Sequence, residues 1–349
     1  MKLGINEISK LYYGTSEVGQ LASSGVSVVF LTDEAQPPTP PPAFVGIRGT
    51  LVDGTSSFTF KLNNTDVTPT IYQEDNKTKF EWEYDDRQIT SLQNAFSGKT
   101  ALVSVDEWTV PVEATANTDN MFKGCNNLIQ PFYFSGQKYV GENCFSGCTG
   151  MQGNLVIPDS VISLGTFAYN WCSGLTGTLT IGSGVTSIGQ FAFIDIRNMT
   201  GDVVIPNSVT TIADYAFNSA KGFNGSLTIG NSVQSIGKRA FYNMVALTGE
   251  IAFPSSMSQI SSGCCSGCTS ISAVTIPSSI TKINDKAFSQ CTHLSKVTVN
   301  RATPPTLGSN VFQNTNNCQI YVPSESVSAY KSAAGWSSYS SRIVAIPST

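Results

Sequence analysis

Two short motifs contain residue types that act in catalysis. Residues 96–100 read Phe-Ser-Gly-Lys-Thr, which resembles the end of a phosphate-binding loop, where backbone N–H groups and a lysine hold phosphate. The first glycine of such a loop is missing, because Gln93 occupies its position. Ser328 and Lys331 have the Ser-x-x-Lys spacing of acyl-transfer enzymes, but the companion motifs of those enzymes are absent. Neither motif therefore predicts an enzyme.

Metal binding is the second kind of chemistry that the residue types could support. His293 is the only histidine, so a Ser-His-Asp triad or a histidine-rich metal site would depend on it alone. Cys265 and Cys268 have the Cys-x-x-Cys spacing of zinc sites, but no second pair accompanies them. The acidic residues of segment 81–85 could bind calcium, yet they alternate with aromatic residues as the solvated face of a strand does. We expect no catalytic residue, no metal site and no cofactor.

The elements that carry these motifs follow a repeat of 23 or 24 residues. An apolar residue before a turn keeps this interval at Ile157, Ile181, Ile205, Ile229, Phe253, Ile276, Val299 and Val322. A residue that is aromatic in all units but one keeps it at Phe122, Phe145, Tyr169, Phe193, Phe217, Phe241, Cys265, Phe288 and Phe312. A third repeated position holds Cys125, Cys148, Cys172, Cys268 and Cys291. We expect these cysteines to be small, buried, apolar side chains with free thiols.

The clearest units share one motif. They read LTIGSGVTSIGQFAF at residues 179–193, LTIGNSVQSIGKRAF at 227–241 and VTIPSSITKINDKAF at 274–288. This pattern resembles the BspA-type leucine-rich repeat family, and the resemblance extends over about residues 89–349. It implies a right-handed solenoid and a binding role, without specifying a ligand. Because one coil buries too few large apolar side chains to fold alone, the coils must stack and the stack must be capped.

We expect a mainly β protein built around a leucine-rich-repeat-like solenoid of 23–24-residue coils. A small β module should precede the coils, because apolar and polar residues alternate between turn signals at 44–52, 57–62, 68–72 and 79–84. A helical cap should follow, because Val327, Tyr330 and Ala334 have helical spacing and Ser324 can act as N-cap. The expected divisions are an N-terminal anchoring arm (1–35), a proline-rich linker (36–42), the β module (43–88), the solenoid (89–322) and the C-terminal cap (323–349).

Each predicted solenoid strand has one outward residue between two inward ones. Leu155 and Ile157 should point into the core, for example, and Val156 to the solvent. The outward residues form one column of small, threonine-rich side chains: Val156, Thr180, Val204, Thr228, Ala252, Thr275, Thr298 and Tyr321. This column is the candidate binding face. Selection for flat strand packing alone would explain the same residues.

The first residues of the chain contain a short duplication. Residues 3–12 read LGINEISKLY and residues 13–21 read YGTSEVGQL. This pattern is similar to the N-terminal segments of many tailed-phage virion proteins, and the similarity implies an arm that anchors the chain to a particle. The candidate anchor residues are Ile5, Ile8, Leu11, Tyr12, Tyr13 and Val18. A generic β-hairpin, or an arm without a virion, explains the same pattern.

Composition limits the partners. The net charge is −4 and 13% of the residues are charged, which argues against a nucleic acid. We expect no membrane insertion and no secretory signal, because no long apolar segment is present. The predicted function is a non-enzymatic phage virion protein of fibre or decoration type. Its arm would hold other virion proteins and its solenoid would bind a host-surface protein or glycan. A bacterial cell-surface BspA-like adhesin is the alternative, and a homo-oligomer stays open.

Overall fold

The computed structural model describes residues 12–13, 16–17 and 44–347. The chain forms two compact units, Met1–Phe44 and Val45–Thr349. In the first unit, β1 (Tyr12–Tyr13) and β2 (Ser16–Glu17) form an antiparallel pair. The other expected anchor residues lie outside the described residues: Ile5, Ile8, Leu11 and Val18.

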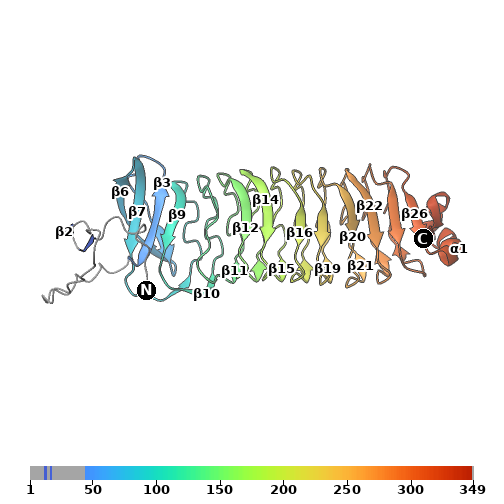
Figure 1. Ribbon diagram of the computed structural model, residues 1–349, viewed down its shortest axis with the longest axis horizontal. Helices are drawn as coiled ribbons and strands as arrows, with labels where there is room; N and C mark the ends of the chain where they lie inside the picture. Colours follow the sequence, from blue (N-terminus) through green and yellow to red (C-terminus); the bar gives the residue numbers. More distant parts are fainter. Residues whose placement is uncertain (1–11, 14–15, 18–43, 348–349) are drawn as a thin grey trace, which may run out of the picture. The chain divides into compact units, whose positions relative to one another are not determined.

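The second unit is a β-solenoid whose coils lie side by side between the N-terminal sheet and α1 in Figure 1. One long strand per coil runs parallel to its neighbours: β12 (Gly153–Ile157), β14 (Leu175–Ile181), β16 (Val203–Ile205), β18 (Leu227–Ile229), β20 (Gly249–Ala252), β22 (Ile271–Ile276), β24 (Lys296–Val299) and β26 (Gln319–Val322). These strands form a long ladder in three hydrogen-bonded sections, β12–β14, β16–β18 and β20–β26. The pairing places Val156 beside Thr180 and Val204 beside Thr228. The repeat therefore predicted the mainly β fold and the strand that each coil contributes.

A short strand in each coil forms a second parallel ladder: β11 (Tyr139–Val140), β13 (Ser163–Leu164), β15 (Ser187–Ile188), β17 (Thr211–Ile212), β19 (Ser235–Ile236), β21 (Gln259–Ile260), β23 (Lys282–Ile283) and β25 (Thr306–Leu307). This short ladder has two hydrogen-bonded sections, β11–β19 and β21–β25. Leu164 and Ile188 are buried, as are the matching apolar residues of most of these strands. In the first coils, β8 (Ile89–Ser91) pairs in parallel with β10 (Val112–Asn117). The two ladders and the turns between them enclose one apolar core.

An antiparallel sheet covers the first coils. Its strand order is β6 (Thr70–Glu74), β7 (Lys77–Glu83), β3 (Gly46–Leu51) and β9 (Leu102–Trp108). Ile47 and Phe80 lie on its buried face, and the Phe80 ring centroid is 5.1 Å from that of Phe58. Strand β9 was not among the expected strands. The sheet shields the apolar end of the stack, which a solenoid requires.

The hairpin that follows β3 already belongs to the coil stack. It consists of β4 (Phe60–Leu62) and β5 (Thr65–Val67). The backbone N–H of Lys61 donates to the Ala95 carbonyl oxygen at 2.8 Å, and that of Asn63 donates to Ser91 at 3.0 Å. The N-terminal sheet and the coils are therefore continuous within one compact unit.

The C-terminal cap contains a helix, as expected, but with different ends. Its elements are η1 (Ser324–Ser326), α1 (Val327–Ser332), η2 (Trp336–Arg342) and β27 (Ile343–Ala345). The expectation that Ser324 caps the helix is wrong, because its hydroxyl donates to Glu325 and α1 begins after Ser326 without a side-chain cap. Ala334 lies beyond the end of α1. The final strand, β27, pairs with β26 and adds one more rung to the long ladder.

Two aromatic residues attach this cap to the last coils. Trp336 is fully buried and its Nε1 donates to the Pro305 carbonyl oxygen at 2.7 Å. The Tyr330 hydroxyl donates to the Arg301 carbonyl oxygen at 2.7 Å, and its ring packs edge-on against Trp336 with the centroids 4.9 Å apart. The cap thus covers the open end of the core with large apolar rings whose polar atoms have partners.

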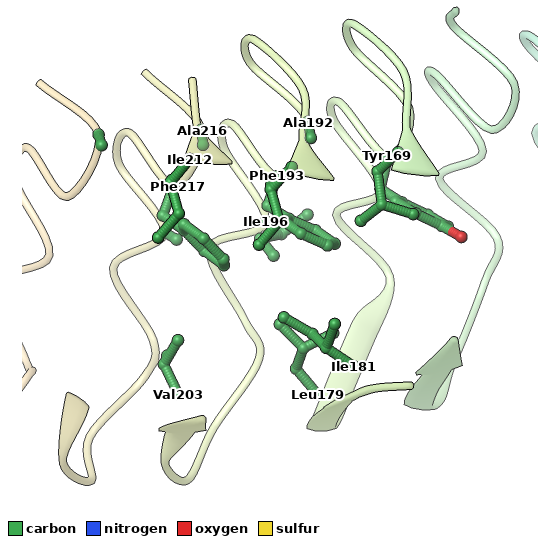
Figure 2. Packing of buried hydrophobic residues seen from close by; sticks show 14 of the residues in the cluster. Tyr169, Leu179, Ile181, Ala192, Phe193, Ile196, Val203, Ile212, Ala216 and Phe217 are labelled. Atoms are coloured by element: carbon green, nitrogen blue, oxygen red, sulfur yellow. The ribbon is translucent and has the colours of Figure 1, made fainter. Parts of the chain in front are cut away.

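A column of stacked aromatic rings runs through the core. Its members are Phe60, Phe96, Phe122, Phe145, Tyr169, Phe193, Phe217 and Phe241. Successive ring centroids lie 4.9–5.5 Å apart and the ring planes are within 23° of parallel. Figure 2 shows Tyr169, Phe193 and Phe217 in a row, with Leu179 and Val203 of the long strands facing them. The spacing is close to the ~4.8 Å between neighbouring strands, so each coil adds one ring.

The aromatic column is interrupted at one coil. Cys265 occupies the ring position there, while Phe253 replaces the isoleucine that ends the long strand in earlier coils. Both side chains are buried, and the Phe253 ring lies 5.9 Å from that of Phe288 at 70°. The large side chain has therefore moved from the turn to the strand, which keeps the filled volume of this coil nearly constant.

This exchange predicts a strong coupling between the two positions. Cys265→Phe alone should overpack the coil, and Phe253→Ile alone should leave a cavity, each lowering the free energy of unfolding by roughly 1–3 kcal/mol. The double variant should restore most of that loss, because it recreates the arrangement of the earlier coils. Urea unfolding of the four proteins measures the coupling. Strictly additive losses would contradict the exchange.

Candidate functional site

The structure places the expected binding column on the exposed face of the long strands. Val156 and Val204 are 54% and 52% exposed, although both are apolar. The exposed polar or small members are Thr180, Thr228 and Ala252. The half-buried members are Thr275, Thr298 and Tyr321. The column therefore presents most surface between β12 and β20.

Neighbouring side chains on the same strands bond to the next coil instead. Asn154 Oδ1 accepts a hydrogen bond from the Thr178 backbone N–H at 2.9 Å, and Asp202 Oδ1 accepts one from the Ser226 N–H at 2.6 Å. The bonds from Ser226 hold the pKa of Asp202 below its usual value. These groups are already engaged, so the valine and threonine column is the part of this face available to a ligand.

Charged side chains border the C-terminal part of the column. Thr275 Oγ1 donates to the Glu250 carboxylate, and the Lys296 ammonium lies 5.6 Å from the Tyr321 ring centroid. Both contacts cover members of the column, which explains why they are less exposed than Val156. Along the long strands, this face is apolar and hydroxyl-bearing near β12 and carries charged side chains near β24 and β26. The two ends of the column therefore differ chemically.

A cavity of about 820 Å³ lies away from this column, lined by β3, β9 and segment 129–132. Two of its charged side chains pair with each other, since Lys79 Nζ is 2.8 Å from Asp106 Oδ2. Burial would raise the pKa of Asp106, but hydrogen bonds from Lys79 and two hydroxyl groups outweigh it and lower that pKa. A carboxylate held ionised in this way is a structural ion pair of the sheet and a poor proton donor.

The motifs with catalytic residue types do not come together. Phe96 lies in the buried aromatic column, and Lys99 Nζ donates to a threonine hydroxyl at 3.1 Å. Ser328 and Lys331 are exposed on α1. His293 is exposed, and its Nδ1 lies 2.6 Å from a backbone carbonyl oxygen. None of these arrangements resembles a nucleophile beside a base.

Two of the three acidic residues of segment 81–85 pair with arginines. Glu81 pairs with Arg48, and Asp85 pairs with Arg87. The Arg87 hydrogen bond lowers the pKa of Asp85. Within residues 12–13, 16–17 and 44–347, no group of three or more His, Cys, Asp or Glu residues could hold a metal ion.

The cysteines have a structural role that the repeat indicated only in part. All nine are buried and free. Five donate their S–H to a carbonyl oxygen of the preceding coil at 2.9–3.1 Å: Cys125, Cys148, Cys172, Cys268 and Cys291. Burial raises the pKa of Cys125 to about 12 and raises that of Cys172 as well. The thiols therefore bond coil to coil and are protected from reaction.

Exposed aromatic residues at the turns were not expected. Trp171 is 62% exposed, and the half-buried rings of Phe167 and Phe191 stack with their centroids 4.7 Å apart. The sequence contains one sign of them, because Phe167 and Trp171 stand where the preceding coil has Asn143 and Gly147. A single sequence does not show that these positions are exposed.

A stack of near-identical coils, capped at both ends and carrying an exposed column on its long strands, is the architecture of a leucine-rich repeat protein. The profile of the BspA type leucine rich repeat region, six copies, matches residues 55–152, 138–225 and 224–338. The chain belongs to this family. Its fold is one that binds partners or acts as a scaffold. No curated protein matches the chain.

Solved structures with a similar fold include bacterial leucine-rich repeat proteins. A leucine rich repeat protein of T. pallidum is 21% identical, with 54% of this chain and 75% of that chain covered and a TM-score of 0.38. A leucine-rich repeat protein of Bacteroides ovatus is 17% identical, with coverage of 85% and 99% and a TM-score of 0.38. A leucine rich cell surface protein of Faecalibacterium prausnitzii is 19% identical, with coverage of 78% and 94% and a TM-score of 0.29. No helix among the described residues is long and apolar enough to cross a membrane.

The buried thiols predict a pH dependence of stability. In the unfolded chain a thiol ionises near pH 8.5, but the folded chain keeps it protonated to higher pH. Thiol burial therefore contributes its full stability below about pH 8.5 and loses it progressively as the pH rises toward the folded pKa. Urea midpoints between pH 7 and pH 10 should fall above about pH 8.5.

The same burial predicts how the thiols react. At pH 8 the native chain should show no iodoacetamide adduct by mass spectrometry, and the chain unfolded in guanidinium should show an adduct on all nine cysteines. A native adduct on Cys125 or Cys172 would show that the coils open around these thiols, and would contradict their protection.

Proposed function

We propose that the chain is a non-enzymatic, surface-presented binding protein whose long-strand column contacts a protein or glycan of another surface. The supporting observation is the column itself, in which two valines more than half exposed lie among threonines on the parallel strand pairs β12–β14 and β16–β18. Apolar groups exposed in register on a rigid scaffold are typical of a binding surface, because contact with a partner removes them from water. A flat array of this kind suits an extended partner.

Membership of the BspA type family supports display on a bacterial cell surface. In that setting the column would act as an adhesin face, and the N-terminal residues would join the solenoid to whatever holds it at the cell. We place this setting first, because it follows from the repeats that form most of the chain.

The duplicated N-terminal motif favours a second setting, in which the chain is part of a phage particle. Residues 3–12 and 13–21 would then anchor the chain to other virion proteins, and the same solenoid face would contact the host. Mass spectrometry of gradient-banded phage particles and of bacterial membrane fractions distinguishes the settings. Detection in particles at a stoichiometry that matches capsid or tail symmetry supports the virion. Detection in membrane fractions alone supports the adhesin.

Charge placed on the column should weaken binding. Val156→Asp with Val204→Asp should reduce binding of the fluorescently labelled chain to intact bacterial or epithelial cells at least tenfold, because both carboxylates would lose hydration in the contact. Flow cytometry measures this.

The matched control places two aspartates on exposed positions of the short-strand ladder, as Thr211→Asp with Ser235→Asp. It should bind like the original chain. Equal loss in both variants would mean that added charge, and not the long-strand column, explains the effect.

A further inference from the structure

In each coil, the turn that carries the aromatic-column position has two positions with a positive φ. The first is occupied by Asn94, Asn120, Asn143, Phe167, Phe191, Tyr215, Arg239, Gly263, Lys286 and Asn310, and the second by Gly98, Gly124, Gly147, Trp171, Asp195, Ser219, Asn243, Gly267, Gln290 and Asn314. Glycine and asparagine adopt this conformation readily, whereas bulky residues rarely do. The first coils use asparagine and glycine throughout, so their turns carry no backbone strain that needs an explanation.

One coil has a bulky aromatic residue at both positions. Phe167 has φ 56° and Trp171 has φ 57°. Phe167 gains a compensating contact, because its ring is within 4° of parallel to Phe191, which stacks in turn on Tyr215 with the centroids 5.0 Å apart. Within the described part of the chain, Trp171 packs against no other aromatic ring. Its backbone conformation is one that bulky residues rarely adopt, and it lacks the ring stacking that Phe167 has.

Trp171 is nevertheless held in a defined orientation. Its Nε1 donates to Asp195 Oδ2 of the next coil at 3.2 Å. Asp195 Oδ1 in turn accepts hydrogen bonds from Arg197 Nε at 3.0 Å and Nη2 at 2.8 Å. The indole is thus fixed by a buttressed hydrogen bond while it stays 62% exposed. A fixed, exposed tryptophan loses little conformational entropy when a ligand packs on it.

The turns in front of this coil have no side chain at the position of Trp171. The preceding coil has Gly147 where Trp171 stands, and Gly124 and Gly98 precede it. A Cβ on Gly147 would meet only backbone atoms of Gly124 within 4 Å. The surface therefore rises in a step from the glycine positions to the Trp171 indole. The face of Phe167 turned away from Phe191 looks in the same direction, toward Asn143.

We infer that this step binds one ring of a neutral glycan. The C–H groups on one face of a hexose would pack against the indole of Trp171, since an aromatic face carries partial negative charge and attracts polarised C–H groups. The hydroxyl groups would donate to Asn143 Oδ1, since Asn143 Nδ2 already donates to Glu142 and the N–H groups of the glycine positions donate to the following coil. The turns before the step carry Lys123 and Glu142, whose charges balance, so the lining favours a neutral ligand over an anionic one.

The size of the step favours a sugar over a protein. It offers one indole and one phenyl face, far less than the ~800 Å² that each partner contributes to a standard protein interface. The step lies on the turns and the column of the proposed function lies on the long strands, so either surface can fail without the other. Glycan binding here would add a second contact to the same solenoid.

The full chain should be titrated with cellohexaose, maltohexaose and chitohexaose as neutral probes and with a heparin hexasaccharide as an anionic probe. Saturation-transfer NMR should detect contact with sugar C–H protons for at least one neutral probe. That probe should also shift the tryptophan fluorescence, because Trp171 is much more exposed than the buried Trp336. Absence of binding by all three neutral probes at millimolar concentration, or tighter binding of heparin, would overturn the proposal.

Trp171→Asn tests the residue without damage to the turn, because Asn243 and Asn314 occupy the same turn position in other coils. Affinity for the neutral probe should fall at least tenfold, while the thermal midpoint stays equal or rises. The control Gln290→Asn introduces asparagine at the same turn position of a distant coil and should leave binding unchanged. Unchanged affinity in Trp171→Asn would show that the indole does not contact the sugar and would overturn the proposal. A clear fall of its thermal midpoint would show that the indole stabilises the fold, and would also contradict the proposal.

Discussion

Stacking between coils is the interaction on which the rest of this structure depends. A coil of 24 residues cannot offset the conformational entropy of its own ordering, because it encloses too few apolar side chains. Every coil but that of Cys265 therefore supplies one ring to a shared aromatic column, and the coils add strands to two parallel ladders. The column also explains both ends, since the N-terminal sheet packs on Phe58 and Phe60 and the cap places Trp336 beyond Phe312.

Much of the fold could be predicted from the sequence because the stack forces equivalent residues into equivalent places. The interval of 23 or 24 residues predicted the strands, their inward residues and the repeated aromatic position. The caps were less predictable, since they are not repeated. Strand β9 pairs with β3, which lies far away in the chain. Strand β27 pairs with β26, although the sequence of β27 does not contain the repeat motif. Ser324 has the residue type of a cap, but a 3-10 turn precedes the helix.

Of the two candidate sites, the sequence predicted the column on the long strands but not the aromatic residues at the turns. Alternation along a strand predicted which residues of the column face the solvent, and the structure places Val156 and Val204 there. The turn residues obey no such alternation, and the positive φ of Phe167 and Trp171 follows from the path of the whole coil. Hydrogen bonds between coils, such as that from Trp171 to Asp195, join residues 24 positions apart and carry no local sequence signal.

Departures from the repeat separate what the fold needs from what a ligand would need. Cys265 breaks the aromatic column, but Phe253 in the same coil fills the space, so the pair is explained by packing alone. Phe167 departs from asparagine and is compensated by stacking on Phe191. Trp171 departs from glycine and stays mostly exposed in a conformation that suits it poorly. Its hydrogen bond to Asp195 orients the indole but does not bury it. In a sequence whose other local choices agree with the fold, a large apolar side chain that stays exposed is where a functional constraint is to be sought.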